Sequence, residues 1–359
     1  MDRGTFDKLL TMSVKKGVSD IHLQVGYPPL FRINGALLEV KIPELSPDDT
    51  EEIAKFIVGK RNIDIMARDF EDFDSSYGVD GAGRFRVNIF KQRETFAVVL
   101  RVIPYHIRSF AELKLPSVLE QVSNLRRGMV LVTGATGMGK STTLAAVLDY
   151  INHSRRTHII TVEDPIEYLF KHDKSIISQR EIGNDTSGFQ PALRAALRQD
   201  PDVIMIGEMR DHVTVDIALK AAETGHLVVS SIHTTDVIKT IGRLISFFPT
   251  EEQGMIRLRL AENLMAIVSL RLLMNKTGTG RVPAVEVMRV TRSVQECIKN
   301  PEKTHEIKEH MEKGRDDYGM QTFDQHLVEL YKANDISLEV AKFAATSASE
   351  FERALTLEP

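Results

Sequence analysis

The chain has 359 residues, of which 42% are apolar and 27% are charged, and its formal net charge is −4. These values are ordinary for a globular protein and allow two or three domains, each with its own core. The negative net charge and the lack of a basic run interleaved with aromatic residues argue against a nucleic-acid partner. The single cysteine, Cys297, excludes a disulfide framework and leads us to expect no thiolate metal site.

The sequence carries no sign of a targeting or membrane-spanning segment. No apolar run reaches the length that crosses a bilayer, and the N-terminal residues lack a signal-peptide pattern. We therefore expect a cytoplasmic protein without direct membrane insertion, which would reach any membrane partner from the cytosol.

Residues 1–102 are predicted to form a small α+β domain. Strand-like segments occur at 21–24, 29–33, 84–90 and 96–102. A helix is predicted over 47–59, because Ser46 is a suitable cap and acidic residues occupy the first turns. Ile103-Pro104 interrupts the last strand, and a polar linker is predicted over 103–116.

The remaining chain divides into two predicted regions. Residues 117–290 alternate strands with helices, which is typical of a parallel α/β sheet. From 291 to 359 the pattern is helical and charged, as at 302–313, and it includes an amphipathic segment at 323–332.

A phosphate-binding loop is the most informative motif. An apolar strand leads into G-x-x-x-x-G-K-S at 134–141, and a helix follows. Glycines allow the backbone N–H groups to face phosphate oxygens, Lys140 brings a positive charge to the β- and γ-phosphates, and Ser141 can ligate Mg²⁺. We therefore predict a nucleoside triphosphate site made by Gly134, Ala135, Thr136, Gly137, Met138, Gly139, Lys140, Ser141 and Thr142.

Polar residues follow the other predicted strands of this region. The carboxyl ends of parallel strands meet at one edge of a sheet, so Glu163, Glu208 and His233 are expected beside the loop. Glu208 stands where a Walker B acid would hold Mg²⁺, and Glu163 is the better candidate for orienting the attacking water, although the two roles could be exchanged.

Two further polar residues near these strand ends, His226 and Arg210, are candidates for the site. His233 and His226 could sense the γ-phosphate. Arg210 could contact phosphate, or it could pair with a neighbouring acid such as Asp211.

Several motifs together resemble the secretion ATPase superfamily. The P-loop is followed by TVEDPIE at 161–167, GEMRD at 207–211 and ETGHLVVSSIHTT at 223–235, which match its Asp box, Walker B and His box. Within this superfamily, GVSDIHL at 17–23, GRFRVN at 83–88, QREIG at 179–183 and GMQTFDQ at 319–325 resemble the PilT/PilU-type motors that retract type IV pili in twitching motility.

The resemblance implies a fold, cofactors and partners that the residues alone do not. It implies a PAS-like N-terminal domain, a RecA-like ATPase domain, a homohexameric ring, and ATP with Mg²⁺ as the cofactors. It also implies that Arg84, Arg86 and Arg101 complete the nucleotide site. The ring would act on an inner-membrane pilus platform protein at the cytoplasmic face of the membrane.

One segment departs from the family pattern. PilT-type motors carry the segment AIRNLIRE, whereas residues 293–300 here read SVQECIKN, with Gln295 and Lys299 in place of the two arginines. This leaves open a self-sufficient retraction motor or a PilU-like accessory member that acts with a sister ATPase. Two other hypotheses remain, a RecA-like nucleic-acid translocase and a non-catalytic adaptor in a mixed ring.

Overall fold

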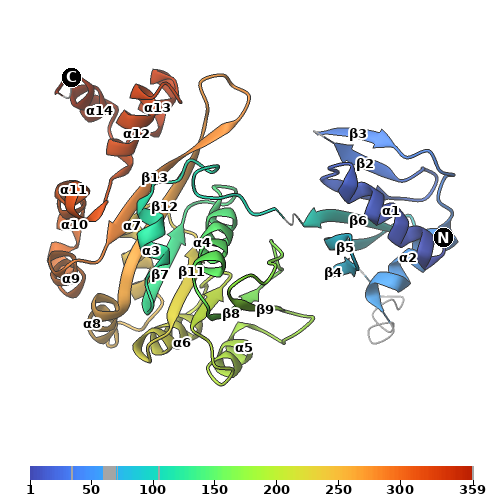
Figure 1. Cartoon of the computed structure of the whole chain (residues 1–359), viewed down its shortest axis with the longest axis horizontal. Helices are drawn as coiled ribbons and strands as arrows, with labels where there is room; N and C mark the ends of the chain where they lie inside the picture. The colour runs from blue at the N-terminus through green and yellow to red at the C-terminus, as the bar shows by residue number, and fades with distance from the viewer. Residues whose placement is uncertain (34, 60–69, 71, 104–105, 358–359) are drawn as a thin grey trace. The chain divides into compact units, whose positions relative to one another are not determined.

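The computed structural model describes residues 1–33, 35–59, 70, 72–103 and 106–357 (Figure 1). The predicted strand interruption at Pro104 lies outside these residues. The chain forms two compact units: Met1–His106 with Pro165–Phe170, and Ile107–Asp164 with Lys171–Pro359. The domain limits given above stay predictions, and the structure adds that Pro165–Phe170 groups with the N-terminal unit.

The N-terminal unit contains a six-stranded antiparallel sheet in the order β3-β2-β1-β6-β5-β4. Its strands are β1 (Asp20–Leu23), β2 (Leu30–Ile33), β3 (Ala36–Glu39), β4 (Asp72–Val79), β5 (Gly83–Gln92) and β6 (Thr95–Ile103). The four predicted strands correspond to β1, β2, β5 and β6, while β3 and β4 extend the sheet at its two edges.

Two helices, α1 (Arg3–Lys15) and α2 (Pro47–Val58), share one core with this sheet. Phe6 of α1, Ile53 of α2 and Phe85 of β5 are all fully buried in it. Ser46 caps α2 as predicted, because its hydroxyl accepts a hydrogen bond from the Asp49 N–H while the Asp49 carboxylate accepts one from the Ser46 N–H. Helix α1 was not among the predicted elements.

The second unit contains a seven-stranded sheet in the order β13-β12-β7-β11-β10-β8-β9. Its strands are β7 (Gly128–Thr133), β8 (His158–Glu163), β9 (Ile176–Glu181), β10 (Val203–Ile206), β11 (Leu227–Ile232), β12 (Leu264–Met274) and β13 (Arg281–Arg289). The predicted parallel strands β7, β8, β10 and β11 are confirmed. The sheet as a whole is mixed, because β13 pairs antiparallel with β12 at one edge.

Helices lie on both faces of the seven-stranded sheet (Figure 1). They are α3 (Val118–Ser123), α4 (Lys140–Ser154), α5 (Phe189–Ala196), α6 (His212–Glu223), α7 (Val237–Ser246) and α8 (Gln253–Asn263). Met129 and Leu131 of β7 pack with α5, α6, α7 and α8 in the main core. Because side chains alternate along a strand, Val130 and Val132 face the other side, which α4 covers.

The C-terminal region is helical, as predicted. It comprises α9 (Arg292–Lys299), the 3₁₀ helix η2 (Pro301–Glu306), α10 (Ile307–Lys313), α11 (Arg315–Tyr318), α12 (Phe323–Lys332), α13 (Leu338–Ala344) and α14 (Ala348–Leu357). Ile298 and Ile307 join the main core, whereas Phe323 and Leu327 belong to a second cluster on β13. Among the described residues, no helix combines the length and apolar character needed to cross a membrane.

Candidate active site

The predicted P-loop joins the end of β7 to the start of α4. Its glycines, Gly134, Gly137 and Gly139, have φ angles of 150°, 78° and 91°. A Cβ atom on Gly134 would lie 2.8 Å from the carbonyl oxygen of Leu270 on β12, so a side chain has no room there. The loop ends at the N-terminus of α4, where backbone N–H groups and the helix dipole favour an anion.

Lys140 is only 9% exposed and lies against the loop. Its ammonium group donates hydrogen bonds to the carbonyl oxygens of Gly134, at 2.9 Å, and Ala135, at 3.0 Å. Burial lowers the pKa of Lys140, and the negative charge of Glu208 partly opposes this shift. Ser141 follows as an exposed residue in the first turn of α4.

A continuous set of polar contacts links the P-loop to the ends of β11 and β10. The Lys140 Nζ atom lies 3.5 Å from His233 Nδ1, and His233 Nε2 lies 3.1 Å from Glu208 Oε2. Glu208 is also ion-paired with Arg210. The structure thus brings together four residues that the sequence placed at the site.

Glu163 ends β8 and is 5% exposed. Two side chains donate to its Oε1 atom, the Thr161 hydroxyl at 2.6 Å and the Gln179 amide at 3.3 Å. Sequence reasoning missed both donors. Thr161 precedes Glu163 by two residues and so shares its face of β8, which was a usable signal, but Gln179 is placed by the pairing of β9 with β8.

Gly207 brings the ends of β8 and β10 close together. Its N–H donates to the Val162 carbonyl at 2.8 Å, and a Cβ atom there would lie 3.4 Å from the Glu163 Cα atom. The glycine that displaces Glu208 from the apolar run therefore has a packing role. The two acidic residues, Glu163 and Glu208, follow adjacent strands at one edge of the sheet.

The structure does not bring His226 to this edge. His226 stands before the first residue of β11, and His233 stands after the last. Seven residue steps of about 3.3 Å each separate the two positions by about 23 Å. The His226 Nδ1 atom instead lies 3.0 Å from the Ala221 carbonyl and 3.1 Å from the Thr224 hydroxyl, so it closes the turn after α6. Contact of His226 with a nucleotide stays a prediction.

Arg84, Arg86 and Arg101 share the outer face of the six-stranded sheet. On β5 the arginines alternate with fully buried core residues, and Arg86 pairs directly with Arg101 of β6. Their partners are the Ser76 hydroxyl at 2.6 Å from Arg84, the Glu167 carboxylate at 3.7 Å from Arg86 and the Asp20 carboxylate at 2.8 Å from Arg101. Contact of these arginines with the nucleotide stays a prediction.

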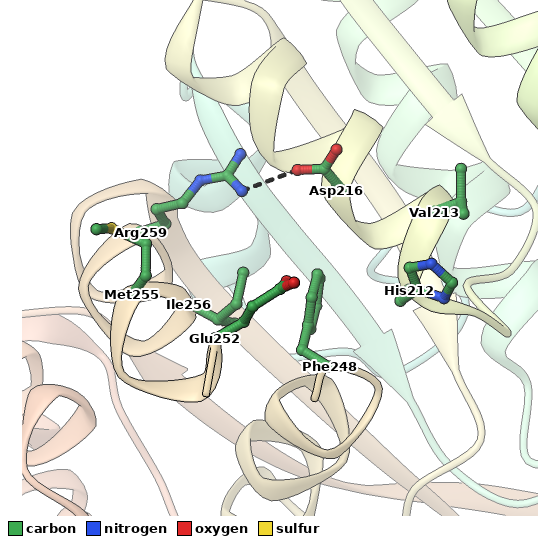
Figure 2. Close-up of a pocket in the computed structure, with 8 residues that line it drawn as sticks. All are labelled: His212, Val213, Asp216, Phe248, Glu252, Met255, Ile256 and Arg259. Atoms are coloured by element: carbon green, nitrogen blue, oxygen red, sulfur yellow. Dashed lines mark hydrogen bonds and ion pairs between the residues drawn. The ribbon is translucent and has the colours of Figure 1, made fainter. Parts of the chain in front are cut away.

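A separate pocket lies between α6 and α8 (Figure 2). His212 and Phe248 meet edge to face in it, and Arg259 pairs with Asp216 at 2.9 Å. None of the residues that line it belongs to the P-loop or to the strand ends described above. The pocket is therefore distinct from the candidate active site.

Residues 3–341 match the family described as "Type II/IV secretion system protein". The chain belongs to this family. It is 43% identical over 347 residues to the type IV pilus retraction ATPase PilT of Pseudomonas aeruginosa, covering 96% of this chain and 99% of that protein. It is 41% identical over 355 residues to the type IV pilus ATPase PilU of the same organism, covering 98% of this chain and 91% of the relative.

The structural comparison agrees with the sequence comparison. A crystal structure of the pilus retraction motor PilT with bound ADP matches this chain with a TM-score of 0.87 at 43% identity, covering 97% of this chain and 98% of that one. The predicted α/β secretion-ATPase fold with its helical C-terminal region is confirmed, as is the PilT/PilU-type resemblance. The chain is a nucleotide-binding P-loop ATPase of this family.

Proposed function

We propose that this chain is a motor ATPase that couples ATP hydrolysis to type IV pilus retraction. The observation that carries the proposal is the edge of the seven-stranded sheet, which holds the P-loop with Lys140, Glu163 at the end of β8 and Glu208 after β10. The near full-length similarity to PilT and PilU supports the type IV pilus as the structure that the motor moves. It also disfavours the alternatives of a nucleic-acid translocase and a non-catalytic adaptor.

Phosphate binding would begin with an exchange of partners at Lys140. The ammonium group now donates to two loop carbonyls, and a phosphate would offer charged oxygens in their place. Such charge-assisted hydrogen bonds are about twice as strong as neutral ones. His233 lies between Lys140 and Glu208. A γ-phosphate that binds Lys140 would therefore change the contacts of Glu208 at the end of β10.

Glu163 suits the task of orienting the attacking water. Its Oε1 atom is fixed by Thr161 and Gln179, so the carboxylate has a defined direction. Glu208 is instead ion-paired with Arg210, and its Oε2 atom lies 3.1 Å from His233 Nε2. We therefore assign Glu163 as the base and Glu208 as the Walker B acid.

Ser141 and Glu208 would hold Mg²⁺. A hydroxyl at the start of α4 and a carboxylate after β10 are oxygen donors of the kind that Mg²⁺ prefers. When bound, the ion neutralises the charge on the β- and γ-phosphates. Arg210, now paired with Glu208, would then be available to the transferred phosphoryl group.

We also propose a cytoplasmic homohexamer that acts on a pilus platform protein at the inner membrane face. Arg84, Arg86 and Arg101 would complete the nucleotide site, because the planar arginine fork binds phosphate in a bidentate manner. Light scattering coupled to size exclusion should find a particle six times the 40.4 kDa chain mass with ATP bound. A monomer under all nucleotide conditions would contradict the ring.

Whether the chain acts alone or with a sister ATPase depends on α9. Gln295 is half-buried, and the Lys299 ammonium lies 3.1 Å from Glu296 on the same helix. Neither residue offers the bidentate contact of an arginine. We therefore propose an accessory role beside a sister ATPase, with ATP turnover retained.

The test is ATP hydrolysis by the purified full-length chain, with Glu163→Gln, Glu208→Gln and the exposed control Glu262→Gln on α8. We expect Glu163→Gln to lower kcat by about 100-fold or more while nucleotide binding persists. The control should match the wild type. Turnover that survives Glu163→Gln and is lost in Glu208→Gln would exchange the two roles, and a wild-type chain without turnover would overturn the ATPase motor.

Pilus retraction is tested in the organism that encodes the chain. Filaments labelled with a fluorophore should retract less often after deletion of the chain, and the wild-type sequence should restore retraction where Glu163→Gln does not. A double deletion with any sister ATPase separates an accessory role from a self-sufficient one. Normal retraction in both deletions would contradict the proposal.

A further inference from the structure

Three side chains of the C-terminal region place three different metal-ligand types together. Cys297 lies in the last turn of α9, Glu306 ends η2, and His310 lies on α10. Their Sγ, carboxylate oxygen and imidazole nitrogen atoms all lie within 4.8 Å of one another. No residue of the candidate active site takes part in this cluster.

We propose that Cys297, Glu306 and His310 form a binding site for Zn²⁺ or a similar borderline-soft divalent metal ion. Zinc accepts thiolate, imidazole and carboxylate ligands at bond lengths of about 2.0–2.3 Å, and a water can complete three protein ligands. At tetrahedral angles these bonds place the ligand atoms about 3.3–3.6 Å apart. The ligand atoms therefore need to approach one another by at most about 1.5 Å, and the Glu306 and His310 side chains that would move are half-buried.

The backbone around the cluster is held in place before any metal binds. Glu306 is the N-cap residue of α10 and His310 lies four residues later, in that helix, so the two residues are one helical turn apart. The Thr304 hydroxyl donates to the Cys297 carbonyl at 3.3 Å, and Arg257 bonds both the Ile298 carbonyl, at 2.9 Å, and Thr304, at 3.3 Å. These contacts fix η2 against α9 and limit the ordering that binding would require.

The charges around the Cys297 sulfur favour a bound cation. Cys297 is buried, and the carboxylate of Glu306 brings a negative charge close to its sulfur. Glu296 adds a second negative charge, and Lys303 opposes it. A divalent ion would displace the thiol proton and neutralise Glu306 in one step.

The site lies outside what the sequence suggested. A single cysteine excludes sites built from several thiolates, so the sequence gave no reason to expect a metal site that includes a thiolate. Only the fold brings Glu306 and His310 to Cys297. An occupied site would tie α9, which carries the segment that departs from the PilT pattern, to α10.

The test uses the reduced full-length chain without nucleotide, so that its outcome is independent of ATP turnover. Zn²⁺ is titrated in competition with a chromogenic chelator, and Co²⁺ is used as a spectroscopic probe. We expect one tightly bound ion per chain and a thiolate-to-cobalt charge-transfer band. Because the chain has one cysteine, this band reports on Cys297 alone.

Substitutions separate this site from the other histidines. His310→Ala and Glu306→Gln should each weaken Zn²⁺ binding by about 10- to 100-fold, while the exposed His305→Ala on η2 should leave it unchanged. Cys297→Ser should remove the charge-transfer band. Zn²⁺ should raise the unfolding temperature of the wild type and of His305→Ala, but not of His310→Ala.

Two results would overturn the site. One is wild-type Zn²⁺ affinity no higher than that of His310→Ala, and the other is a bound Co²⁺ spectrum without a thiolate band. Since His310 and Glu306 are only half-buried, their substitution should leave the fold intact, which circular dichroism checks. In either case Cys297 would be an ordinary buried thiol of the main core.

Discussion

Charged side chains at the edge of the seven-stranded sheet and on the outer face of the six-stranded sheet are held very differently. Lys140 and Glu163 are 9% and 5% exposed, and each is engaged in at least two hydrogen bonds. The side chains of Arg86 and Arg101 are 45% and 70% exposed and are engaged in ion pairs. One group is built into the fold, and the other lies at its surface.

The difference suggests two ways in which charged side chains can be arranged to bind a phosphate, either fixed in the interior or paired at the surface. Buried polar groups in a region of low dielectric interact strongly and hold a fixed geometry. Exposed ion pairs contribute about 0–1 kcal/mol, so Arg101 can exchange Asp20 for a stronger anion at little cost. The burial of Asp20 raises its pKa, but hydrogen bonds from Arg101 and Ser19 and the charge of Arg101 outweigh this, so the pKa of Asp20 lies below its usual value.

Lys140→Ala should produce the largest effect. It removes a buried cation and the hydrogen bonds that its ammonium group donates to the loop carbonyls of Gly134 and Ala135. We expect kcat for ATP to fall by about 10³-fold, a loss typical for one preorganised electrostatic group. Steady-state hydrolysis measures this, with the exposed Lys313→Ala on α10 as the control. A loss below tenfold would mean that the edge of the sheet is not preorganised around Lys140.

Buried titratable groups of the second unit should also dominate the pH dependence of stability. Burial lowers the pKa of His326 to about 4, and its Nδ1 atom accepts a hydrogen bond from the Val285 N–H at 2.8 Å. Between pH 6.5 and about 4 the unfolded state therefore binds a proton that the folded state does not, so stability falls as the pH falls. Relative to His326→Asn, the wild type should lose about 2–3 kcal/mol over this range.

Glu286 provides a control with the opposite sign. Burial raises its pKa to about 7, so the folded state binds the extra proton and stability falls as the pH rises from about 4.5 to 7. Glu286→Gln should remove this fall in stability between pH 4.5 and about 7. Urea unfolding at several pH values measures both variants. Parallel pH curves for the wild type and His326→Asn would count against the buried-histidine argument.

The sequence predicted the parts of the site that depend on strand ends. A parallel sheet brings its carboxyl ends together whatever the details of packing, so Lys140, Glu163, Glu208 and His233 could be placed without coordinates. His226 lies at the other end of β11 from His233, because the six residues between them form the whole strand. A pattern of residue types near a motif does not say at which end of the strand each residue lies.

The other contacts that the sequence did not predict depend on how strands distant in the sequence pair. Gln179 reaches Glu163 only because β9 pairs with β8 so that Thr161 lies opposite Gln179. The antiparallel β13 and the helix α1 likewise depend on pairing and packing with distant segments. On β5 the two-residue alternation was sufficient to place Arg84 and Arg86 on one face, although it could not supply their partners.

Gln179→Ala should have an intermediate effect on activity. Losing this donor leaves Thr161 as the remaining described donor to Glu163 Oε1, so the carboxylate gains freedom while its charge is unchanged. We expect kcat to fall about tenfold with little change in KM, because a positioning contact acts on the chemical step. Thr157→Val, at the opposite end of β8, should match the wild type. A change confined to KM would show that Gln179 serves nucleotide binding instead.

Asp20→Asn should have the smallest effect, although it removes the carboxylate that lies 2.8 Å from Arg101. The side chain of Arg101 is 70% exposed, so solvent replaces much of what the pair supplies, and the free energy of unfolding should fall by less than about 1 kcal/mol. ATP turnover should stay within about twofold of the wild type, because an arginine that exchanges partners does not need this one. Chemical unfolding and steady-state hydrolysis on the same preparation measure both quantities. A tenfold loss of turnover would mean that Asp20 orients Arg101, so that the outer face of the six-stranded sheet is as preorganised as the P-loop edge.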